Sequence, residues 1–150
     1  MRCVVQRVSQ AAVSVDGEVT GSIGPGLLVL AGFENGDGPQ DLEWMARKLV
    51  NLRIFPDYDG DMNCSLHDIS GDVLAVSQFT LYASTRKGNR PSWARAARGE
   101  ISQPLFDQFC LHLTQALGKP VATGKFGAHM QISLTNDGPV TITIDSRSPE

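Results

Sequence analysis

The segment Val73–Tyr82 reads Val-Leu-Ala-Val-Ser-Gln-Phe-Thr-Leu-Tyr, an apolar run that passes into a polar motif. A short apolar run of this kind is typical of a strand that is buried on both faces. We therefore predict a central strand over Asp72–Leu81, whose buried part stops near Ser77. The motif contains no His, no Cys and no pair of carboxylates. A site at this point would work mainly with backbone groups.

A second informative segment, Asn136–Thr141, reads Asn-Asp-Gly-Pro-Val-Thr and lies between two strand-like runs, Met130–Leu134 and Val140–Ile144. Proline has no N–H to donate to a sheet, and glycine adopts backbone angles that other residues avoid. The pattern predicts two strands that flank a Gly-Pro corner.

The remaining sequence predicts a mixed α/β, mostly β single domain over residues 1–150. Short Val-rich runs and an Asp-Gly turn indicate further strands: Cys3–Val8, Ala11–Val15, Glu18–Ile23, Leu27–Ala31 and Arg53–Phe55. Apolar residues at helical spacing predict one helix from Pro39 and another from near Pro104 to Leu117, ended by Gly118. We expect Ser146–Glu150 to form a frayed tail.

The composition excludes several classes of protein. The chain has 150 residues, 41% of them hydrophobic, and a net charge of -3, which argues against a protein that coats nucleic acid by bulk electrostatics. No apolar run is long enough for a membrane span, and the first residues contain no signal-peptide core. Three widely spaced cysteines without a CxxC motif favour free thiols and a cytoplasmic protein without disulfides or zinc.

Two groups of residues resemble metal ligands without fitting a metal site. Asp57, Asp59 and Asp61 suggest a calcium loop. An EF-hand loop, however, needs a glycine at its sixth position and a glutamate at its twelfth. Here Gly60 stands at the fourth position and Asp68 at the twelfth. His67, His112 and His129 have no ligand spacing. We expect no metal and no cofactor.

A basic segment interrupts this acidic chain. It contains five basic residues and no acid between Thr85 and Gly99: Arg86, Lys87, Arg90, Arg95 and Arg98. Charge runs are usually solvated surface, yet positive charge beside the Ser77–Tyr82 segment also suits phosphate groups. We interpret Arg86, Lys87 and Arg90 as a docking patch for phosphate groups.

Ser77 and Thr80 are candidate nucleophiles, but a nucleophilic hydroxyl needs a base within hydrogen-bond reach, and the local sequence offers none. Hydroxyls at a strand end more often bond to backbone. The backbone N–H groups of the motif can instead stabilise an oxyanion.

The Ser-Gln-Phe-Thr and Asn-Asp-Gly-Pro-Val-Thr motifs together closely resemble the D-aminoacyl-tRNA deacylase family. The resemblance extends over about Met1 to Asp145 and includes these shorter matches: Gln6–Val8, Gly24–Leu28, Asn51–Phe55, Thr85–Gly88, Arg90–Ser92, Thr123–Gly124, Phe126–Ala128 and Met130. Trp93 departs from the pattern, since Phe is frequent there. His129 stands at a variable position, which counts against a catalytic role.

The resemblance implies a homodimeric hydrolase with a β-sheet or barrel core and two main helices, which cleaves the ester of D-aminoacyl-tRNA. It implies that Gly138 and Pro139, joined by a cis peptide bond, enter the pocket of the partner subunit. Their carbonyl oxygens would hold the substrate's α-ammonium and exclude L-amino acids, and Arg7 would orient them.

By the same resemblance, Ser77, Gln78, Phe79 and Thr80 line the catalytic pocket, while Phe126 and Met130 contact the terminal adenosine of the tRNA. Two alternatives remain open. One is an editing domain of the threonyl-tRNA synthetase type, acting on a wrong L-aminoacyl-tRNA; the other is a non-catalytic RNA-binding module.

Overall fold

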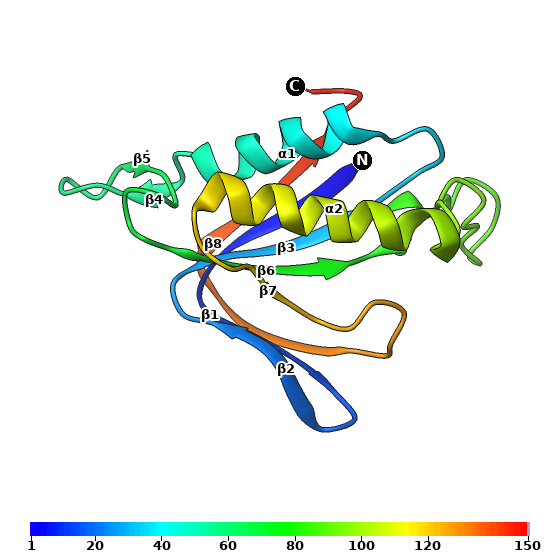
Figure 1. Cartoon of the computed structure of the whole chain (residues 1–150), viewed down its shortest axis with the longest axis horizontal. Helices are drawn as coiled ribbons and strands as arrows, with labels where there is room; N and C mark the ends of the chain where they lie inside the picture. Colours follow the sequence, from blue (N-terminus) through cyan, green and yellow to red (C-terminus); the bar gives the residue numbers. More distant parts are fainter. Residues whose placement is uncertain (150) are drawn as a thin grey trace.

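The computed structural model describes residues 1–149 (Figure 1). Its strands are β1 Arg2–Val15, β2 Glu18–Ile23, β3 Gly26–Gly32, β4 Phe55–Pro56, β5 Met62–Cys64, β6 Asp72–Ser77, β7 Ala122–Thr123 and β8 Gln131–Asp145. Its helices are α1 Pro39–Asn51, the 3-10 helix η1 Phe79–Tyr82 and α2 Gly99–Leu117. The mixed α/β, mostly β class with two main helices is confirmed.

One main sheet organises the molecule. Its strands lie in the order β2-β1-β3-β6-β7, and β8 pairs with β1 along the edge that faces away from β3. β3, β6 and β7 are parallel, so each pair needs a crossover connection. α1 lies in the first crossover and α2 in the second, and both helices cover the same face of the sheet (Figure 1). The lower part, with β2, β7 and half of β8, curls into a partial barrel.

The core has two parts because β3 is buried on both faces. Leu27 and Val29 point to the helices and pack with Leu49 and Phe109 in the larger cluster. Leu28 points the other way, into the smaller cluster inside the curled sheet. Side chains alternate along a strand, so an uninterrupted apolar run such as that of β3 supplies both clusters at once.

The central strand is shorter than predicted. β6 ends at Ser77, which pairs with Ala31 of β3, and the Gln78 N–H then donates to the Ala31 carbonyl at 2.7 Å. β3 itself ends at Gly32, so no ladder partner exists further along. The chain turns into η1 instead of continuing as a strand to Leu81.

Two predicted strand pairs prove to be single long strands. Cys3–Val8 and Ala11–Val15 join in β1, since β8 pairs with both halves and holds them in one ladder. Met130–Leu134 and Val140–Ile144 likewise join in β8. The sequence suggested breaks, but pairing with a long neighbour outweighs weak local signals.

The second helix begins earlier than predicted. α2 starts at Gly99, after Arg98, and Pro104 lies inside it. The missing N–H of Pro104 leaves the carbonyl of Glu100 without its helical partner. Glu100 is exposed in the first turn, so water can satisfy that carbonyl and the helix tolerates the proline.

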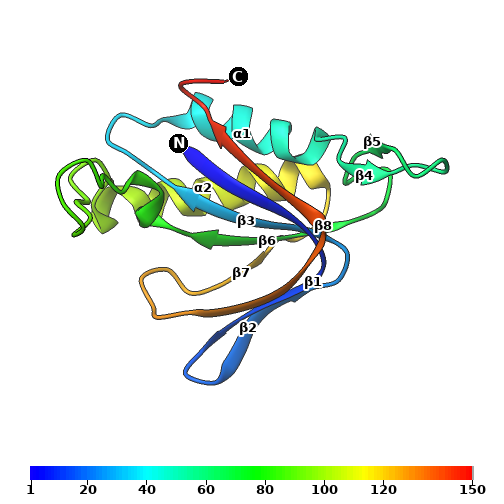
Figure 2. The same ribbon diagram turned by 180° about the vertical axis from the view of Figure 1, so that it is seen from behind.

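The start of the expected frayed tail is tied to the fold. The Met1 α-ammonium donates to Asp37 at 2.8 Å and to the Ser146 hydroxyl at 2.7 Å, and Ser146 donates to Asp41 at 2.6 Å. Arg147 lies 3.2 Å from Asp37. The two ends of the chain therefore lie side by side (Figure 2). Ser146 and Arg147, which we expected to begin a frayed tail, are thus bonded to the fold, and Glu150 lies outside the described residues.

Candidate active site

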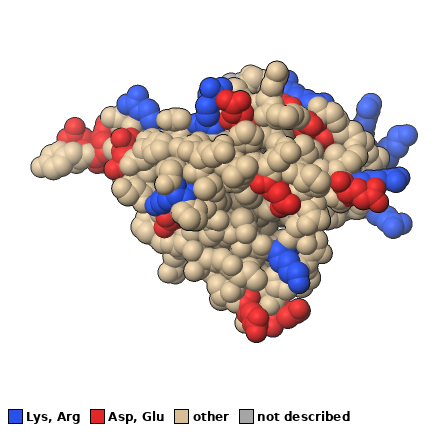
Figure 3. Space-filling view, viewed as in Figure 1, with Lys and Arg blue, Asp and Glu red and all other residues tan. Residues whose placement is uncertain are grey.

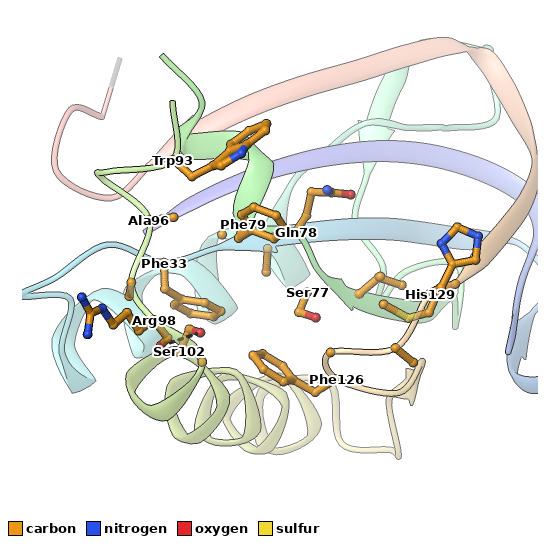
Figure 4. Close-up of a pocket in the computed structure, with 18 of the residues that line it drawn as sticks. Phe33, Ser77, Gln78, Phe79, Trp93, Ala96, Arg98, Ser102, Phe126 and His129 are labelled. Carbon is orange, nitrogen blue, oxygen red and sulfur yellow. Dashed lines mark hydrogen bonds between the residues drawn. The ribbon is translucent and has the colours of Figure 1, made fainter. Parts of the chain in front are cut away.

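A cavity of about 520 Å3 opens at the carboxyl ends of β3 and β6 (Figure 4). Ser77–Phe79 form one wall, the start of α2 forms another, and the segment from Phe126 to Ile132 forms the third. In parallel sheets ligands bind at the carboxyl ends of the strands, where backbone groups and side chains converge. Ser77, Gln78 and Phe79 of the Ser-Gln-Phe-Thr motif therefore line this cavity.

Gly32 allows the motif to approach β3 closely. A Cβ at Gly32 would lie 2.8 Å from the Gln78 carbonyl oxygen and 3.2 Å from the Leu81 Cβ. Any side chain there would push η1 outward. This glycine was not recognised as a site residue in the sequence, because its role depends on the distant residue that packs against it.

No general base activates the hydroxyls of the motif. The Thr80 hydroxyl accepts a hydrogen bond from the Gln78 side-chain amide, which is a donor and cannot take a proton. Among residues 1–149, no His, Asp or Glu side chain is hydrogen-bonded to Ser77 or Thr80. The two hydroxyls are therefore unactivated alcohols in this site.

The backbone at the start of η1 is more suited to chemistry. The Gln78 N–H is taken by Ala31, whereas the N–H groups of Phe79 and Thr80 open the 3-10 helix, where no preceding turn supplies an acceptor. Two adjacent N–H groups with this freedom are the kind of donors that stabilise an oxyanion. The Ser77 side chain points into the same cavity (Figure 4).

Phe126 and Met130 form an apolar wall of the cavity. Phe126 packs against Phe106 of α2, with ring centroids 6.1 Å apart. Met130 passes so close to Gly124 that a Cβ there would clash with its sulfur. The wall has the flat and apolar character that a nucleobase or an apolar side chain can contact.

Gly138 and Pro139 lie elsewhere, in a bulge of β8. The ladder with β1 pairs Gln6 with Thr141 and Val8 with Asn136, so Asp137–Val140 lie opposite Arg7 alone. Such an excess of residues on one strand forces the chain out of the sheet. The Gly138–Pro139 peptide bond is cis and both residues are exposed.

The bulge is held from two sides. The Arg7 Nε donates to the Asp137 carbonyl at 2.7 Å, and its Nη1 donates to the Ile54 carbonyl at 2.5 Å. The Asn136 side chain spans the bulge, since its Oδ1 accepts from the Val140 N–H at 2.8 Å and its Nδ2 donates to the Val140 carbonyl at 3.0 Å. Arg7 therefore ties the bulge of β8 to the segment that follows α1. Asn136 is a second holding residue whose role the sequence analysis missed.

Within one chain, the bulge and the cavity are apart. Arg7 pairs with Leu27 at the beginning of β3, whereas the cavity lies at Ala31 near its end. Four residues of strand span about 13 Å. None of Arg7, Gly138 and Pro139 lines the cavity. The structure thus brings Ser77, Gln78, Phe79, Phe126 and Met130 together and leaves the Gly-Pro tip separate; Thr80 lies beside the cavity, in η1.

The basic segment forms an exposed loop next to the cavity. Ser84 and Ser92 exchange backbone hydrogen bonds of 2.9 Å in both directions and so close the loop that carries Arg86, Lys87 and Arg90. Basic side chains gather at this end of the molecule, at the right of Figure 3. Within residues 1–149, none of these three has an acidic partner within ion-pair distance. Arg95 differs, because it pairs with Glu34 at 3.1 Å.

Several residues that line the cavity could not be predicted from the sequence, because their side chains are apolar, small or common hydroxyls that match no catalytic or binding motif. Phe33, Ala96, Gly99 and Ser102 line it because β3 and the start of α2 meet there. His129 lines it as well and is exposed. Of these unpredicted lining residues, Trp93 alone stood out in the sequence, because it replaces the Phe that is frequent at this position in the family that the chain resembles.

The described residues offer no metal centre, and two of the three thiols are shielded by burial. Among residues 1–149 no three His, Cys, Asp or Glu side chains are placed to hold a metal ion. Burial raises the pKa of the Cys3 thiol, and it raises that of Cys110 to about 12. Neither forms a thiolate at neutral pH. In the part of the chain that the structure describes, no helix is long and apolar enough to cross a membrane.

Comparison with known proteins places this geometry in a family. The model of the family described as D-Tyr-tRNA(Tyr) deacylase matches residues 4–145. The chain is 65% identical over 150 residues to a protein of Dechloromonas aromatica named D-aminoacyl-tRNA deacylase, and 64% identical over 150 residues to one of Chromobacterium violaceum with the same name. In both cases the similarity covers 100% of each chain.

Two solved structures share the fold. One, titled c-Myc DNA Unwinding Element Binding Protein, has a TM-score of 0.92 and 41% identity and covers 100% of each chain. The other, a probable eukaryotic D-amino acid tRNA deacylase, has a TM-score of 0.81 at 20% identity and covers 95% of this chain and 97% of its own. The second similarity concerns the fold alone.

Proposed function

Because the chain belongs to the D-Tyr-tRNA(Tyr) deacylase family, we propose that it hydrolyses the ester bond of D-aminoacyl-tRNA to a free D-amino acid and tRNA. The observation that carries the proposal is the cavity at the end of β6, where the Ser-Gln-Phe-Thr motif offers backbone donors and no general base. Deacylation assays with paired D- and L-aminoacyl-tRNAs test it. Hydrolysis of the L-ester alone would instead identify an editing domain, and tRNA binding without hydrolysis a binding module.

The chemistry suits a site of this kind. An aminoacyl ester is already activated, so the protein needs only to position it, stabilise the developing oxyanion and admit water. The N–H groups of Phe79 and Thr80 are the oxyanion donors in this proposal. The 2′-hydroxyl of the terminal ribose takes part in activating the attacking water. Phe126 and Met130 contact the terminal adenosine.

Chiral selection in this proposal comes from a second copy of the chain. The Gly138–Pro139 tip cannot serve the cavity of its own chain, since the two lie at opposite ends of β3. In a homodimer, the tip of one protomer enters the cavity of its partner. Its carbonyl oxygens accept hydrogen bonds from the substrate's α-ammonium, and its backbone leaves no room for an L side chain. Arg7 and Asn136 keep the tip rigid.

The partner of the enzyme in this proposal is tRNA, and its location is the cytoplasm. The substrate is charged tRNA, so the enzyme works in the cytoplasm, where tRNA is charged. The loop with Arg86, Lys87 and Arg90 contacts phosphates of the tRNA, because its charges are exposed and, within residues 1–149, lack an acidic partner such as the one that neutralises Arg95.

Thr80→Ala should keep appreciable activity. Among residues 1–149 the Thr80 hydroxyl is hydrogen-bonded to the Gln78 amide alone, and the proposed chemistry uses the Thr80 backbone N–H, which alanine retains. We expect a loss of about tenfold or less in kcat, from looser positioning of η1. Single-turnover kinetics on D-aminoacyl-tRNA measure it. A loss on the order of a million-fold, as for removal of a true nucleophile, would contradict the backbone mechanism.

Replacing Arg86, Lys87 and Arg90 together with Gln should weaken tRNA binding and flatten its dependence on salt. The slope of log K against log salt concentration is negative, and each lost phosphate contact reduces its magnitude by about 1. We therefore expect the magnitude of the slope to fall by about 3. The matched control replaces Arg47, Lys48 and Arg53, which are exposed basic residues on and after α1. An unchanged slope in the loop variant would place the docking surface elsewhere.

A further inference from the structure

The mouth of the cavity carries two exposed aromatic side chains to which the proposed function assigns no role. Phe79 is 55% exposed and Trp93 is 41% exposed, and their ring centroids lie 5.3 Å apart at an interplanar angle of 72°. Both residues line the cavity (Figure 4). We define this pair as the aromatic rim. A pair of large aromatic side chains left half in water beside a site indicates a binding surface.

The rim is unlike the other exposed apolar residues. Among residues 1–149, the aromatic pairs in contact otherwise involve Phe33, Phe106, Phe109 and Phe126, which are buried or half-buried. Among residues 1–149, the exposed aromatic side chains are Tyr58, Phe79 and Trp93, and Tyr58 has no aromatic ring in contact and does not line this cavity. The rim therefore combines exposed ring surface with a place at the cavity.

The charge around the rim selects the kind of partner. Trp93 lines the cavity and directly follows Ser92, the residue that closes the basic loop, so the rim connects the cavity to the loop that carries Arg86, Lys87 and Arg90. Exposed rings beside a basic segment are the arrangement by which proteins bind single-stranded nucleic acid, because bases stack on the rings and phosphates meet the cations. A purely apolar partner would leave these charges unused.

The direction of the substrate determines which nucleotide meets the rim. Every tRNA ends in an unpaired C-C-A sequence, and the proposed function places the terminal adenosine inside the cavity, against Phe126. The strand must leave the cavity at its mouth to reach the basic loop. We propose that the aromatic rim binds the unpaired cytidine that precedes the terminal adenosine, with its base stacked on Trp93, and this proposal rests on the proposed function.

The proposal predicts that Trp93 matters only when nucleotides precede the adenosine. D-Tyrosine would be esterified to adenosine alone and to the trinucleotide C-C-A, and kcat/KM measured for each ester. In Trp93→Ala the ratio of kcat/KM for the trinucleotide to that for adenosine should fall about tenfold, mainly through KM. Trp93→Phe should restore most of the ratio, since Phe also stacks. Trp44→Ala, which removes the other tryptophan, is the matched control and should leave the ratio unchanged.

Fluorescence gives a readout that does not need activity. The chain has two tryptophans, so Trp44→Phe leaves Trp93 as the sole indole. Uncharged C-C-A should quench its emission by stacking, and adenosine monophosphate should quench it far less. Equal quenching by both ligands, or none by C-C-A, would overturn the proposal.

Other outcomes assign the rim differently. An equal loss on both esters in Trp93→Ala would mean that Trp93 shapes the cavity and does not read the upstream nucleotide. A change of oligomeric state in Trp93→Ala, measured by sedimentation, would make the rim a contact between copies of the chain. If the wild-type enzyme hydrolyses neither these esters nor D-tyrosyl-tRNA, the proposed function fails, and the quenching experiment still decides whether the rim binds the nucleotide.

Discussion

Gly138→Ala is expected to lower kcat/KM for D-aminoacyl-tRNA about a hundredfold. A Cβ at Gly138 would lie 2.6 Å from the Val140 nitrogen and 2.8 Å from the Val140 Cγ2, so the bulge must shift. The shift moves the two carbonyl oxygens away from the α-ammonium. Two charge-assisted hydrogen bonds of about 1.5 kcal/mol each amount to about a hundredfold in rate. Steady-state deacylation kinetics measure the loss.

Two controls separate this effect from a general loss of structure. Gly24→Ala places a Cβ in open space and should leave activity near the wild-type value. The second control mixes chains carrying Gly138→Ala with chains carrying Phe126→Ala. If the tip acts in the partner's cavity, the mixture should regain about a quarter of wild-type activity, because half of the dimers are hybrids with one intact site each. No regain, or an active monomer in the ultracentrifuge, would contradict the dimeric site.

Glycyl-tRNA should be hydrolysed while L-alanyl-tRNA stays intact. In the proposed site, selection rests on a backbone wall that collides with an L side chain, and glycine has no side chain to collide. Its α-ammonium still reaches the carbonyl oxygens of the partner subunit's Gly138 and Pro139. A wall can reject only what is too large for the space, so the smallest substrate passes. We expect at least a hundredfold difference in kcat/KM between the glycyl and L-alanyl esters.

The test is a deacylation time course on glycyl, D-alanyl and L-alanyl esters of matched tRNAs. The D-alanyl ester is the positive control, and spontaneous hydrolysis without enzyme gives the baseline for each ester. If glycine resists as completely as L-alanine, the enzyme recognises a D side chain positively and steric rejection is the wrong model. If glycyl-tRNA is hydrolysed as we expect, any protection of correctly charged glycyl-tRNA must come from outside this pocket.

Several elements followed from local sequence. The Asp16–Gly17 turn between β1 and β2, the apolar run of β3 and the helical spacing of α1 each depend on neighbouring residues. The end of the buried run at Ser77 was also readable. The predicted start of α2 near Pro104 was too late, because the actual start depends on the solvation of one carbonyl. The predicted central strand was too long, because its end depends on where β3 stops.

The candidate site was readable only in part. The resemblance to the family implied the site residues Ser77–Thr80, Gly138, Pro139 and Arg7. The sequence could not predict that Arg95 is neutralised by Glu34 while Arg86 stays unpaired, because that difference depends on which loop packs where.

The sequence by itself determined the fold class, the family and a candidate motif that lacks a general base, because strand and helix periodicity, turn residues and motif letters are local properties of the chain. Tertiary structure alone decided that Asp137–Val140 bulge out opposite Arg7, and that this bulge and the cavity lie at opposite ends of β3. The physical reason is register. A ladder is specified by pairs of residues far apart in sequence, and the mismatch between β1 and β8 that extrudes Gly138 and Pro139 exists only once both strands are paired.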